Sequence, residues 1–562
     1  MKFTEMPYER VDVEKLKSDI RKVTGDFKAA DSLDGVISAM TDMDALMKSY
    51  CTMRNIAYIR YTINTADPFY VEENRYFSAT APYIEEALQD YYKALVKTPF
   101  RAQLEEKYGT LIFMRQACAI KGFAPEITEL MQQEADLEMA YQQIMGKAVI
   151  HFEGQELSLA EMGKYVSNAD AAVRKKAYSA MGAFYDAKRE ALDDIFDKLV
   201  KNRTAQAQAL GYDSYVDLAY IRRERSYTVE DVRNYRQQVV EDLVPLTVKL
   251  KKEQAKRIGV EKISLSDNGT LFKDGNAVPK GTPEDLLNAA KDMYSEMHPE
   301  TKAFIEFMFE NALFDVLPKP GKTTGAYEES LPDYKCPFIF SSFSGTEGDV
   351  ETLTHEAGHA FADYVASRTL PLLDMQLPTM EAAETHSMSM EFLSAPWHHM
   401  FFGEETDKYA YSHLAGALFF IPYGCMVDHM QEICYLHPEL TPEERNAKWL
   451  ELEQIYRPYL DLTGFPAYER GAGWQRQLHL YTVPYYYIDY CLAETVALQF
   501  FMASLKDWKA AFEKYLSFVH MGGRKTFVEL TKDAGLKTPF EDGALKDIMD
   551  GAAKWLDENP VK

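Results

Sequence analysis

The sequence predicts a mostly α-helical protein in which a small β-sheet lies beside one central helix. Apolar residues recur at helical spacing, with charged residues between them, through most of residues 12–147 and again over residues 392–459. A short apolar and aromatic run at residues 338–343 breaks this pattern and has the composition of a strand. It ends near Gly345, just before another helical stretch, so we expect the strand to support that helix.

Length and composition indicate one large body with sub-domains. The 562 residues suffice for several domains, but no long Pro/Gly/Ser-rich linker or low-complexity run divides them. Hydrophobic residues make up 46% of the chain, which is ample for a sizeable core. We place a soft boundary near residue 200, so that residues 1–199 form an N-terminal helical region and residues 200–562 contain the chemistry.

The charge balance excludes two classes of partner. The chain has 62 basic and 87 acidic residues, a net charge of -25. Such a balance repels nucleic acid and anionic lipid headgroups, so we expect neither nucleic acid nor a membrane as a partner. No feature of the sequence indicates an oligomeric state.

Cysteine usage and the N-terminus favour a cytoplasmic protein. The first residues contain no apolar signal core, and nowhere do about 18 apolar residues run together. The six cysteines are scattered without a Cys-x-x-Cys pair, which argues against a disulfide framework or a thiolate metal site. We interpret Cys491 as a small buried residue.

Two irregular segments have turn signals between short apolar runs, and we expect a small β-hairpin in the first and a hairpin or strand pair in the second. Residues 148–157 alternate and turn at Glu153 and Gly154, and residues 262–278 contain Asn-Gly and Asp-Gly pairs between short apolar runs. The strand at residues 338–343 leads through Thr346 or Asp349 as a cap into the next helix. Its edge could accept an extended peptide backbone by strand addition, or the strand could only support the helix, and the sequence leaves both open.

The helix after this strand contains the string His355-Glu356-Ala-Gly-His359. Two histidines four residues apart lie about 40° apart around a helix axis, so both imidazoles can face one metal ion. Glu356 faces the same pocket and can act as a general base. A catalytic zinc ion takes three protein ligands and keeps one open position, so a third ligand is required.

Glu384 is the best candidate for the third ligand. It lies in a helix predicted to begin after Thr379 as N-cap, and it shares a face with Glu391. His386 is turned about 200° away from Glu384. Glu391 could orient a ligand imidazole, or it could be a surface or helix-pairing carboxylate. The nitrogen and oxygen ligand set favours zinc, which cobalt or manganese could replace.

Six further histidines do not repeat the ligand spacing. We interpret them as core or surface residues, because none has a second histidine and an acid at the required separation. The set comprises His151, His398, His399, His413, His429 and His437.

A second stretch of chemical interest follows at residues 470–490. It contains glycines, which we expect to form a flexible loop, then His479 and a tyrosine cluster with Tyr486, Tyr487 and Tyr490. Tyrosines at helical spacing often only pack in a core. Here the imidazole and phenols could instead donate hydrogen bonds to an oxyanion, a contribution of about 3–4 kcal/mol per donor in hydrolases.

Together these motifs resemble the oligoendopeptidase F and thimet oligopeptidase family of zinc peptidases. The resemblance rests on the His-Glu-x-x-His string, Glu384 25 residues beyond His359, the Phe-Ile-Phe-Ser-Ser-Phe-Ser-Gly-Thr run, and the Arg-Gly-Ala-Gly-Trp-Gln-Arg-Gln and His-x-Tyr-x-x-Pro-Tyr-Tyr-Tyr-Ile-Asp-Tyr stretches. It spans about residues 320–500.

The resemblance implies a large helical, two-lobed body that encloses a deep cleft. It also implies that His355, His359 and Glu384 bind one zinc ion per chain, that Glu356 activates the water, and that His479 with Tyr486, Tyr487 or Tyr490 stabilises the transition state.

The expected activity is zinc-dependent hydrolysis of internal bonds in short peptides. One alternative is a zinc carboxypeptidase or dipeptidase on a related helical scaffold, in which Arg470 and Arg476 could dock the substrate terminus. Another is a peptide-binding protein with a structural metal, which the intact Glu356 argues against because a structural site needs no base.

Overall fold

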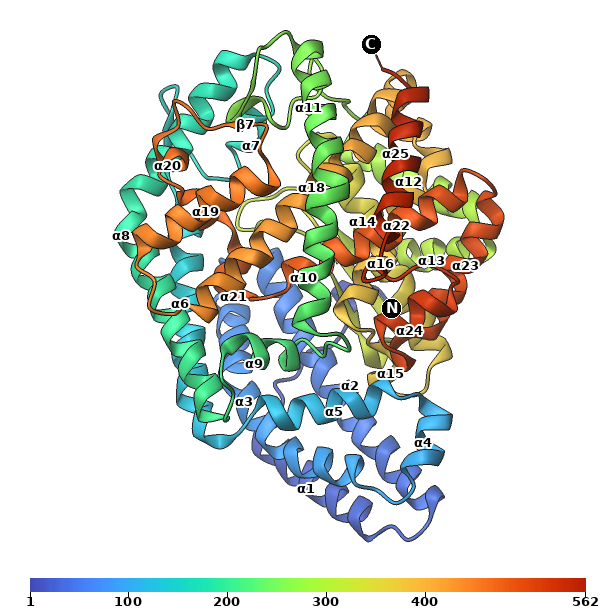
Figure 1. Ribbon diagram of the computed structural model, residues 1–562. Helices are drawn as coiled ribbons and strands as arrows, with labels where there is room; N and C mark the ends of the chain where they lie inside the picture. The colour runs from blue at the N-terminus through green and yellow to red at the C-terminus, as the bar shows by residue number, and fades with distance from the viewer. Residues whose placement is uncertain (562) are drawn as a thin grey trace. The chain divides into compact units, whose positions relative to one another are not determined.

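A computed structural model of the chain describes residues 1–561. The predicted mostly α-helical fold with few short strands is confirmed (Figure 1). The chain folds into two compact units, each assembled from three segments. Unit 1 contains Met1–Pro125, Val278–Gly403 and Val496–Leu536, and unit 2 contains Glu126–Ala277, Glu404–Thr495 and Lys537–Lys562.

The predicted boundary near residue 200 differs from this division. Residue 200 lies inside helix α8 (Ala171–Ala209), where the chain continues without a break. Contacts between segments far apart in the sequence define the units, and a composition pattern along the chain cannot report such contacts. The cleft between two lobes that the resemblance implies stays a prediction.

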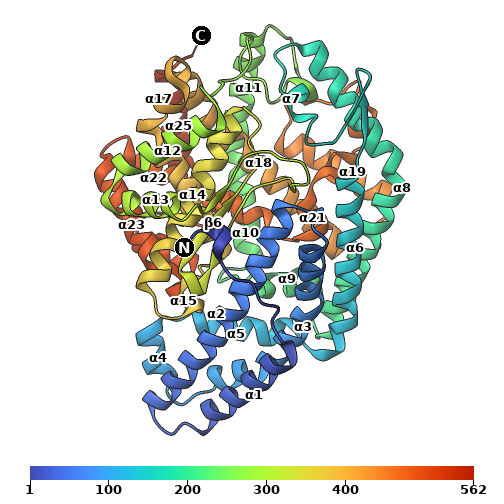
Figure 2. The same cartoon turned by 180° about the vertical axis from the view of Figure 1, so that it is seen from behind.

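Unit 1 is a helical array with one small sheet. Helices α1, α2, α3 and α5 pack side by side (Figures 1 and 2) around a core that includes Ile20, Ala57 and Leu95. Its helices are α1 (Val13–Ala29), α2 (Leu33–Ile63), α3 (Pro68–Val96), α4 (Arg101–Tyr108), α5 (Leu111–Gly122), α12 (Pro283–Met297), α13 (Pro299–Glu310), α14 (Glu347–Thr369), α15 (Leu373–Gln376), α16 (Met380–Leu393), α17 (His399–Phe402), α23 (Trp508–Met521) and α24 (Phe527–Asp533).

The sheet of unit 1 lies beside α14, as predicted. Its strands are β4 (Phe314–Asp315), β5 (Tyr327–Leu331) and β6 (Cys336–Phe340), in the order β4-β6-β5. Strand β6 is buried throughout and pairs parallel with β4 and antiparallel with β5. Both β5 and β6 pack against α14 (Figure 2).

Strand β6 lies in the middle of the sheet, and this position decides whether it could bind a peptide by strand addition or only support α14. The backbone N–H groups of Ile339, Ser341 and Phe343 donate to carbonyls of residues 313–316 on one side, and β5 occupies the other side. A strand paired on both sides has no edge to offer an added strand. The prediction that this strand could accept a peptide by strand addition is therefore wrong, and its role is to support α14.

Unit 2 is also helical, with two short strand pairs. Its elements are α6 (Thr128–Gly146), β1 (Ile150–Phe152), β2 (Gln155–Leu157), α7 (Gly163–Val166), α8, α9 (Tyr215–Arg222), α10 (Val229–Gln238), α11 (Val244–Ile258), β3 (Ile263–Ser264), α18 (Thr406–Leu436), α19 (Pro442–Tyr456), β7 (Leu460–Asp461), α20 (Pro466–Glu469), α21 (Leu478–Thr482) and α25 (Ala544–Glu558). Helix α22 (Tyr487–Ser504) contributes residues to both units.

One of the two predicted hairpins forms. Strands β1 and β2 pair antiparallel and turn at Glu153 and Gly154, whose φ angles are 49° and 80°. The second segment forms one short strand, β3, but no hairpin or strand pair of its own, because β3 pairs parallel with the distant β7. The Asn268 region cannot form a ladder, since the side-chain amide of Gln254 donates to the carbonyls of residues 267, 268 and 270.

Within the described residues, one helical stretch, His399–Leu436, is long and apolar enough to cross a membrane by length and composition. Some 67% of its most apolar window is buried inside the fold, as in the core helix of a folded domain.

Candidate metal centre and tyrosine cluster

Helix α14 begins with a network that fixes its first turn. Thr346 is the N-cap residue but makes no side-chain cap bond. The carboxylate of Asp349 instead accepts hydrogen bonds from the backbone N–H groups of Ser344, at 2.8 Å, and Gly345, at 2.6 Å. A carboxylate in the first turn also complements the positive end of the helix dipole. The start of the helix is thereby held to the loop that follows strand β6.

Helices α14 and α16 approach each other closely at Gly358. A Cβ atom at this position would lie 2.5 Å from Cα of Ser387 and 2.8 Å from the carbonyl oxygen of His386. Only glycine allows this approach, which brings the helix of Glu384 against the helix of the two histidines. Gly358 is part of the His-Glu-Ala-Gly-His string, but sequence reasoning assigned it no role.

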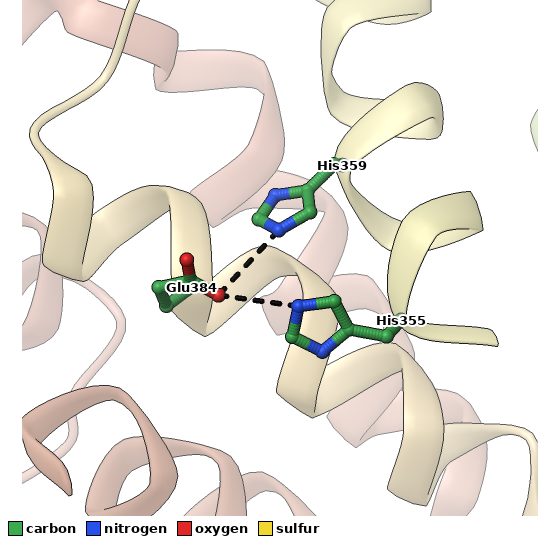
Figure 3. Close-up of side chains that lie close together, drawn as sticks. All are labelled: His355, His359 and Glu384. Carbon is green, nitrogen blue, oxygen red and sulfur yellow. Dashed lines mark ion pairs between the residues drawn. The ribbon is translucent and has the colours of Figure 1, made fainter. Parts of the chain in front are cut away.

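The structure brings together the three residues predicted to bind metal (Figure 3). The Nε2 atoms of His355 and His359 lie 3.3 Å and 3.5 Å from Oε2 of Glu384. All three potential ligand atoms lie within 4.8 Å of one another, and no other such group occurs among residues 1–561. The two imidazoles come from successive turns of α14, and the carboxylate comes from α16.

This arrangement fits a zinc ion. Ligand bonds of about 2.0–2.1 Å in a tetrahedral site place the ligand atoms about 3.3–3.4 Å apart, close to the two nitrogen–oxygen separations found here. Two imidazole nitrogens and one carboxylate oxygen leave a fourth position open. Burial alone would raise the pKa of Glu384. The two imidazoles lower this pKa by more than burial raises it, so the pKa lies well below the ordinary value. Glu384 is therefore ionised, as a ligand must be.

Glu391 lies against the first of these imidazoles. Its Oε1 atom is 2.7 Å from Nδ1 of His355. An ionised carboxylate only accepts hydrogen bonds, so Nδ1 carries the proton and Nε2 keeps its lone pair for the metal. Of the two roles left open for Glu391, this geometry favours orienting His355.

Glu356 is buried next to the ligands. It is 6% exposed. Burial raises its pKa above the ordinary value, while the neighbouring imidazoles of His355 and His359 oppose this rise. A raised carboxyl pKa suits a group that must accept a proton from water and release it again.

His386 lies away from the ligand atoms, as its helical position predicts. Its ring packs edge-on against Phe518, with centroids 5.4 Å apart, and Tyr515 donates to its backbone carbonyl. Burial lowers the pKa of the His386 imidazole to about 3, so it stays neutral. It is a core residue that packs α16 onto α23.

The second predicted cluster forms in unit 2. The ring of His479 lies 5.7 Å from that of Tyr486, 5.0 Å from Tyr487 and 6.0 Å from Tyr490. Burial raises the pKa of Tyr487 well above the ordinary value, so its phenol remains a donor at all physiological pH values. The three tyrosine rings and the imidazole therefore form one aromatic cluster.

Gln477 fixes the tautomer of His479. The hydroxyl of Tyr423 donates to Oε1 of Gln477 at 2.9 Å, so the amide nitrogen faces His479. This nitrogen lies 2.9 Å from Nδ1 of His479 and donates to it. The proton of a neutral His479 therefore lies on Nε2, which can donate a hydrogen bond. Sequence reasoning missed Gln477, although it precedes His479 by only two residues.

Three arginines of unit 2 donate hydrogen bonds to backbone carbonyls of the tyrosine segment. Arg203 donates to the carbonyls of Leu480 and Tyr481, and Arg223 donates to that of Pro484. Arg225 donates to the Tyr485 carbonyl and to the carboxylate of Asp489 at 2.9 Å. Tyr485 has a φ angle of 62°, a left-handed conformation that needs such support. These arginines lie 260–278 residues upstream of the groups they bind, so no local pattern could reveal them.

The glycines before this segment do not form a flexible loop, and that expectation is wrong. Residues 471–475 are buried. A Cβ at Gly471 would lie 2.1 Å from the carbonyl oxygen of Asn446, and one at Gly473 would lie 3.2 Å from Nε1 of Trp449. The glycines permit close packing against α19.

Comparison with known proteins agrees with the sequence resemblance. A family model described as peptidase family M3 matches residues 164–550, and one described as the peptidase M3 N-terminal domain matches residues 3–123. Oligopeptidase PepF of Bacillus subtilis (strain 168) is 21% identical over 579 residues, which cover 97% of this chain and 83% of PepF.

Solved structures are similar over the whole chain. A structure of PZ peptidase A with an inhibitor is 42% identical, with a TM-score of 0.96 and 99% of both chains covered. Oligoendopeptidase F from Enterococcus faecium is 14% identical with a TM-score of 0.62, covering 98% of this chain and 97% of that one, which shows a likeness of fold. The protein is thus a peptidase that acts on oligopeptides. By these matches and the geometry above, the chain belongs to peptidase family M3.

Proposed function

We propose that the protein is a zinc-dependent oligoendopeptidase that hydrolyses internal bonds of short peptides. The observation that carries this proposal is the convergence of His355, His359 and Glu384, with the buried Glu356 beside them. Cobalt or manganese could replace zinc in this nitrogen and oxygen ligand set.

Each residue of the metal centre in unit 1 has a defined task in this proposal. A bound zinc ion supplies Lewis-acid chemistry, which makes water nucleophilic near neutral pH and polarises a carbonyl. Glu356 accepts the proton that the attacking water loses and returns it to the leaving amine nitrogen. Glu391 holds the tautomer of His355, and Gly358 keeps Glu384 within reach of the imidazoles.

His479 and the tyrosine cluster are the proposed oxyanion donors. Nε2 of His479, protonated because Gln477 donates to Nδ1, would donate to the oxyanion, together with the phenol of Tyr486, Tyr487 or Tyr490. One such donor contributes a factor of about 10²–10³ to kcat in hydrolases. Replacing each tyrosine in turn by phenylalanine identifies the donor, because only its loss lowers kcat by this factor.

Two alternatives remain for the activity. A carboxypeptidase or dipeptidase must bind a substrate terminus, and of the two arginines considered for this task Arg470 is paired with Asp186. A non-catalytic peptide-binding protein would not need the buried base. We further propose that the protein works in the cytoplasm on short peptides. We also propose that neither nucleic acid nor a membrane is a partner, because the net charge of -25 repels both.

The deciding experiment compares four versions of one peptide of about eight residues: unblocked, blocked at the N-terminus, blocked at the C-terminus, and blocked at both ends. The zinc-loaded protein is incubated with each, and the products are identified by mass spectrometry. An endopeptidase cuts the doubly blocked peptide at an internal bond. A carboxypeptidase spares every peptide with a blocked C-terminus, and that result would replace the proposal by the first alternative.

A further inference from the structure

Helix α18 presents two adjacent residues to the proposed oxyanion donors. Tyr423 contacts the segment of His479, and Gly424 contacts α22, the helix that begins at Tyr487 and carries Tyr490. All of these residues belong to unit 2. One short stretch of a neighbouring helix therefore touches both parts of the cluster, the imidazole side and the phenol side.

Tyr423 acts on His479 through Gln477. The Tyr423 hydroxyl donates to Oε1 of Gln477 at 2.9 Å, and the amide nitrogen of Gln477 lies 2.9 Å from Nδ1 of His479. The two ends of an amide have the same shape, and the end that faces the imidazole decides which ring nitrogen carries the proton. The ring of Tyr423 is itself held between two cations, since the guanidinium carbons of Arg457 and Arg476 lie 4.8 Å and 5.9 Å from its centroid.

Gly424 allows a close approach of α18 to α22. A Cβ atom at this position would lie 2.2 Å from Sγ of Cys491, whereas ordinary contacts begin at about 3.5 Å. The thiol of Cys491 is fully buried and lies 3.6 Å from the backbone carbonyl oxygen of Ile421. Cys491 is one helical turn beyond Tyr487, so this contact supports the first turn of α22.

The first turn of α22 sets the distance between the phenols and the imidazole. The ring centroids of Tyr487 and Tyr490 lie 5.0 Å and 6.0 Å from that of His479. A displacement of α22 by about 1 Å would change these separations, and a misplacement of that size typically costs about 100-fold in rate.

We propose that Tyr423 and Gly424 are positioning residues for the oxyanion donors. Tyr423 fixes the proton of His479 on Nε2, and Gly424 seats α22 so that its tyrosines face the imidazole. This inference rests on the proposed function, because it concerns the donor group of that same reaction.

The test of Gly424 uses a clash and its relief. Gly424→Ala adds the methyl, and Cys491→Ala removes the sulfur that the methyl would meet. In the double variant the nearest atoms to the methyl would be two ring carbons of Tyr487, at 3.5 Å and 3.7 Å, which are ordinary contacts. Gly416→Ala is the matched control, because Gly416 lies in the same helix and its added methyl would meet nothing within 4 Å.

We expect Gly424→Ala to lower kcat for the doubly blocked peptide about 100-fold with little change in KM. The double variant should have a kcat within about threefold of Cys491→Ala alone, and Gly416→Ala should keep the native kcat. Thermal melts and circular dichroism establish that the variants compared are folded. Native kcat in Gly424→Ala, or an equal loss with and without the sulfur, would overturn the role of Gly424.

The test of Tyr423 adds no atom, so it carries little risk of unfolding. Tyr423→Phe removes only the hydroxyl that holds the amide of Gln477, and we expect kcat to fall about tenfold or more with little change in KM. Tyr411→Phe is the control, because Tyr411 lies in the same helix and its phenol instead accepts a hydrogen bond from Arg257 at 2.8 Å.

The position of the proton is measured by ¹⁵N NMR of histidine-labelled, zinc-loaded protein at a pH where the imidazole is neutral. The protonated and the bare ring nitrogen give separate signals, and the spectrum of His479→Gln assigns those of His479. The proton should lie on Nε2 in the native protein and in Tyr411→Phe, and move in part to Nδ1 in Tyr423→Phe.

This measurement needs no turnover, so it separates the inference from the proposed function. If the native protein cuts no doubly blocked peptide but the proton moves in Tyr423→Phe, the function proposal fails and Tyr423 still orients His479. If the proton stays on Nε2 in Tyr423→Phe, the role of Tyr423 is overturned, whether or not kcat falls.

Discussion

The approach of α14 to α16 at Gly358 makes the metal centre sensitive to a single methyl group. The methyl of Gly358→Ala would lie 2.5 Å from Cα of Ser387, and ordinary contact between carbons begins at about 3.5 Å. Helix α16 must therefore move by about 1 Å. Overpacking of this kind typically costs about 1–3 kcal/mol of folding free energy.

The displacement has a larger effect on function than on stability. Glu384 is three residues before Ser387 and moves with it, whereas metal sites tolerate deviations of only about 0.2 Å in ligand distance. We expect zinc affinity to fall at least about tenfold, and kcat/KM to fall about 100-fold, the effect typical of a 1 Å misplacement.

Zinc binding is measured by competition with a chromogenic chelator, and unfolding by thermal melts. Gly25→Ala is the matched control. Gly25 lies inside helix α1, and its added methyl would meet nothing within 4 Å. This control should gain up to about 1 kcal/mol from its better helix propensity and should leave zinc affinity unchanged. Native zinc affinity and activity in Gly358→Ala would refute the reasoning.

Three further predictions follow from other contacts. Glu391→Gln keeps the shape of the side chain but removes the negative charge beside His355, so zinc affinity should fall about tenfold. The affinity is measured by the same chelator competition, and an unchanged affinity contradicts the orienting role. Gln477→Leu removes the donor to Nδ1 of His479, so kcat should fall about tenfold or more with little change in KM, and a pure rise in KM argues against a role in the transition state. Burial raises the pKa of Glu329 to about 7 in the folded state, whereas the unfolded chain releases this proton near pH 4.3. The folded state therefore loses stability from this group as the pH rises from about 4.3 to 7. The melting temperature of Glu329→Gln minus that of the native protein should therefore be more positive at pH 8 than at pH 5, and a pH-independent difference contradicts the assignment.

The local part of the site could be predicted from the sequence. The spacing of His355 and His359 fixes their common helix face, and the predicted start of α16 at Thr379 places Glu384 and Glu391 on one face. These are consequences of helix geometry, which the sequence determines over a few turns.

The parts that depend on distant partners could not be predicted. The edge of β6 is covered by the two-residue strand β4, which is too short to show a strand pattern. The Asn-Gly pair at residue 268 suggested a hairpin, but the side chain of Gln254 binds the carbonyls on which a ladder depends. Arg225 holds Asp489 from more than 250 positions away, and nothing in its own neighbourhood indicates this.

The central claim, that one metal ion and Glu356 together cleave the peptide, is tested most directly by a zinc titration. Chelator-stripped native protein and Glu356→Gln receive increasing zinc, and both bound zinc and cleavage of a doubly blocked peptide are measured. The native protein should regain activity in proportion to zinc, saturating at one ion per chain, while Glu356→Gln binds the same single ion and remains several orders of magnitude less active. Activity in the metal-free native protein, or native activity in zinc-loaded Glu356→Gln, would contradict the account.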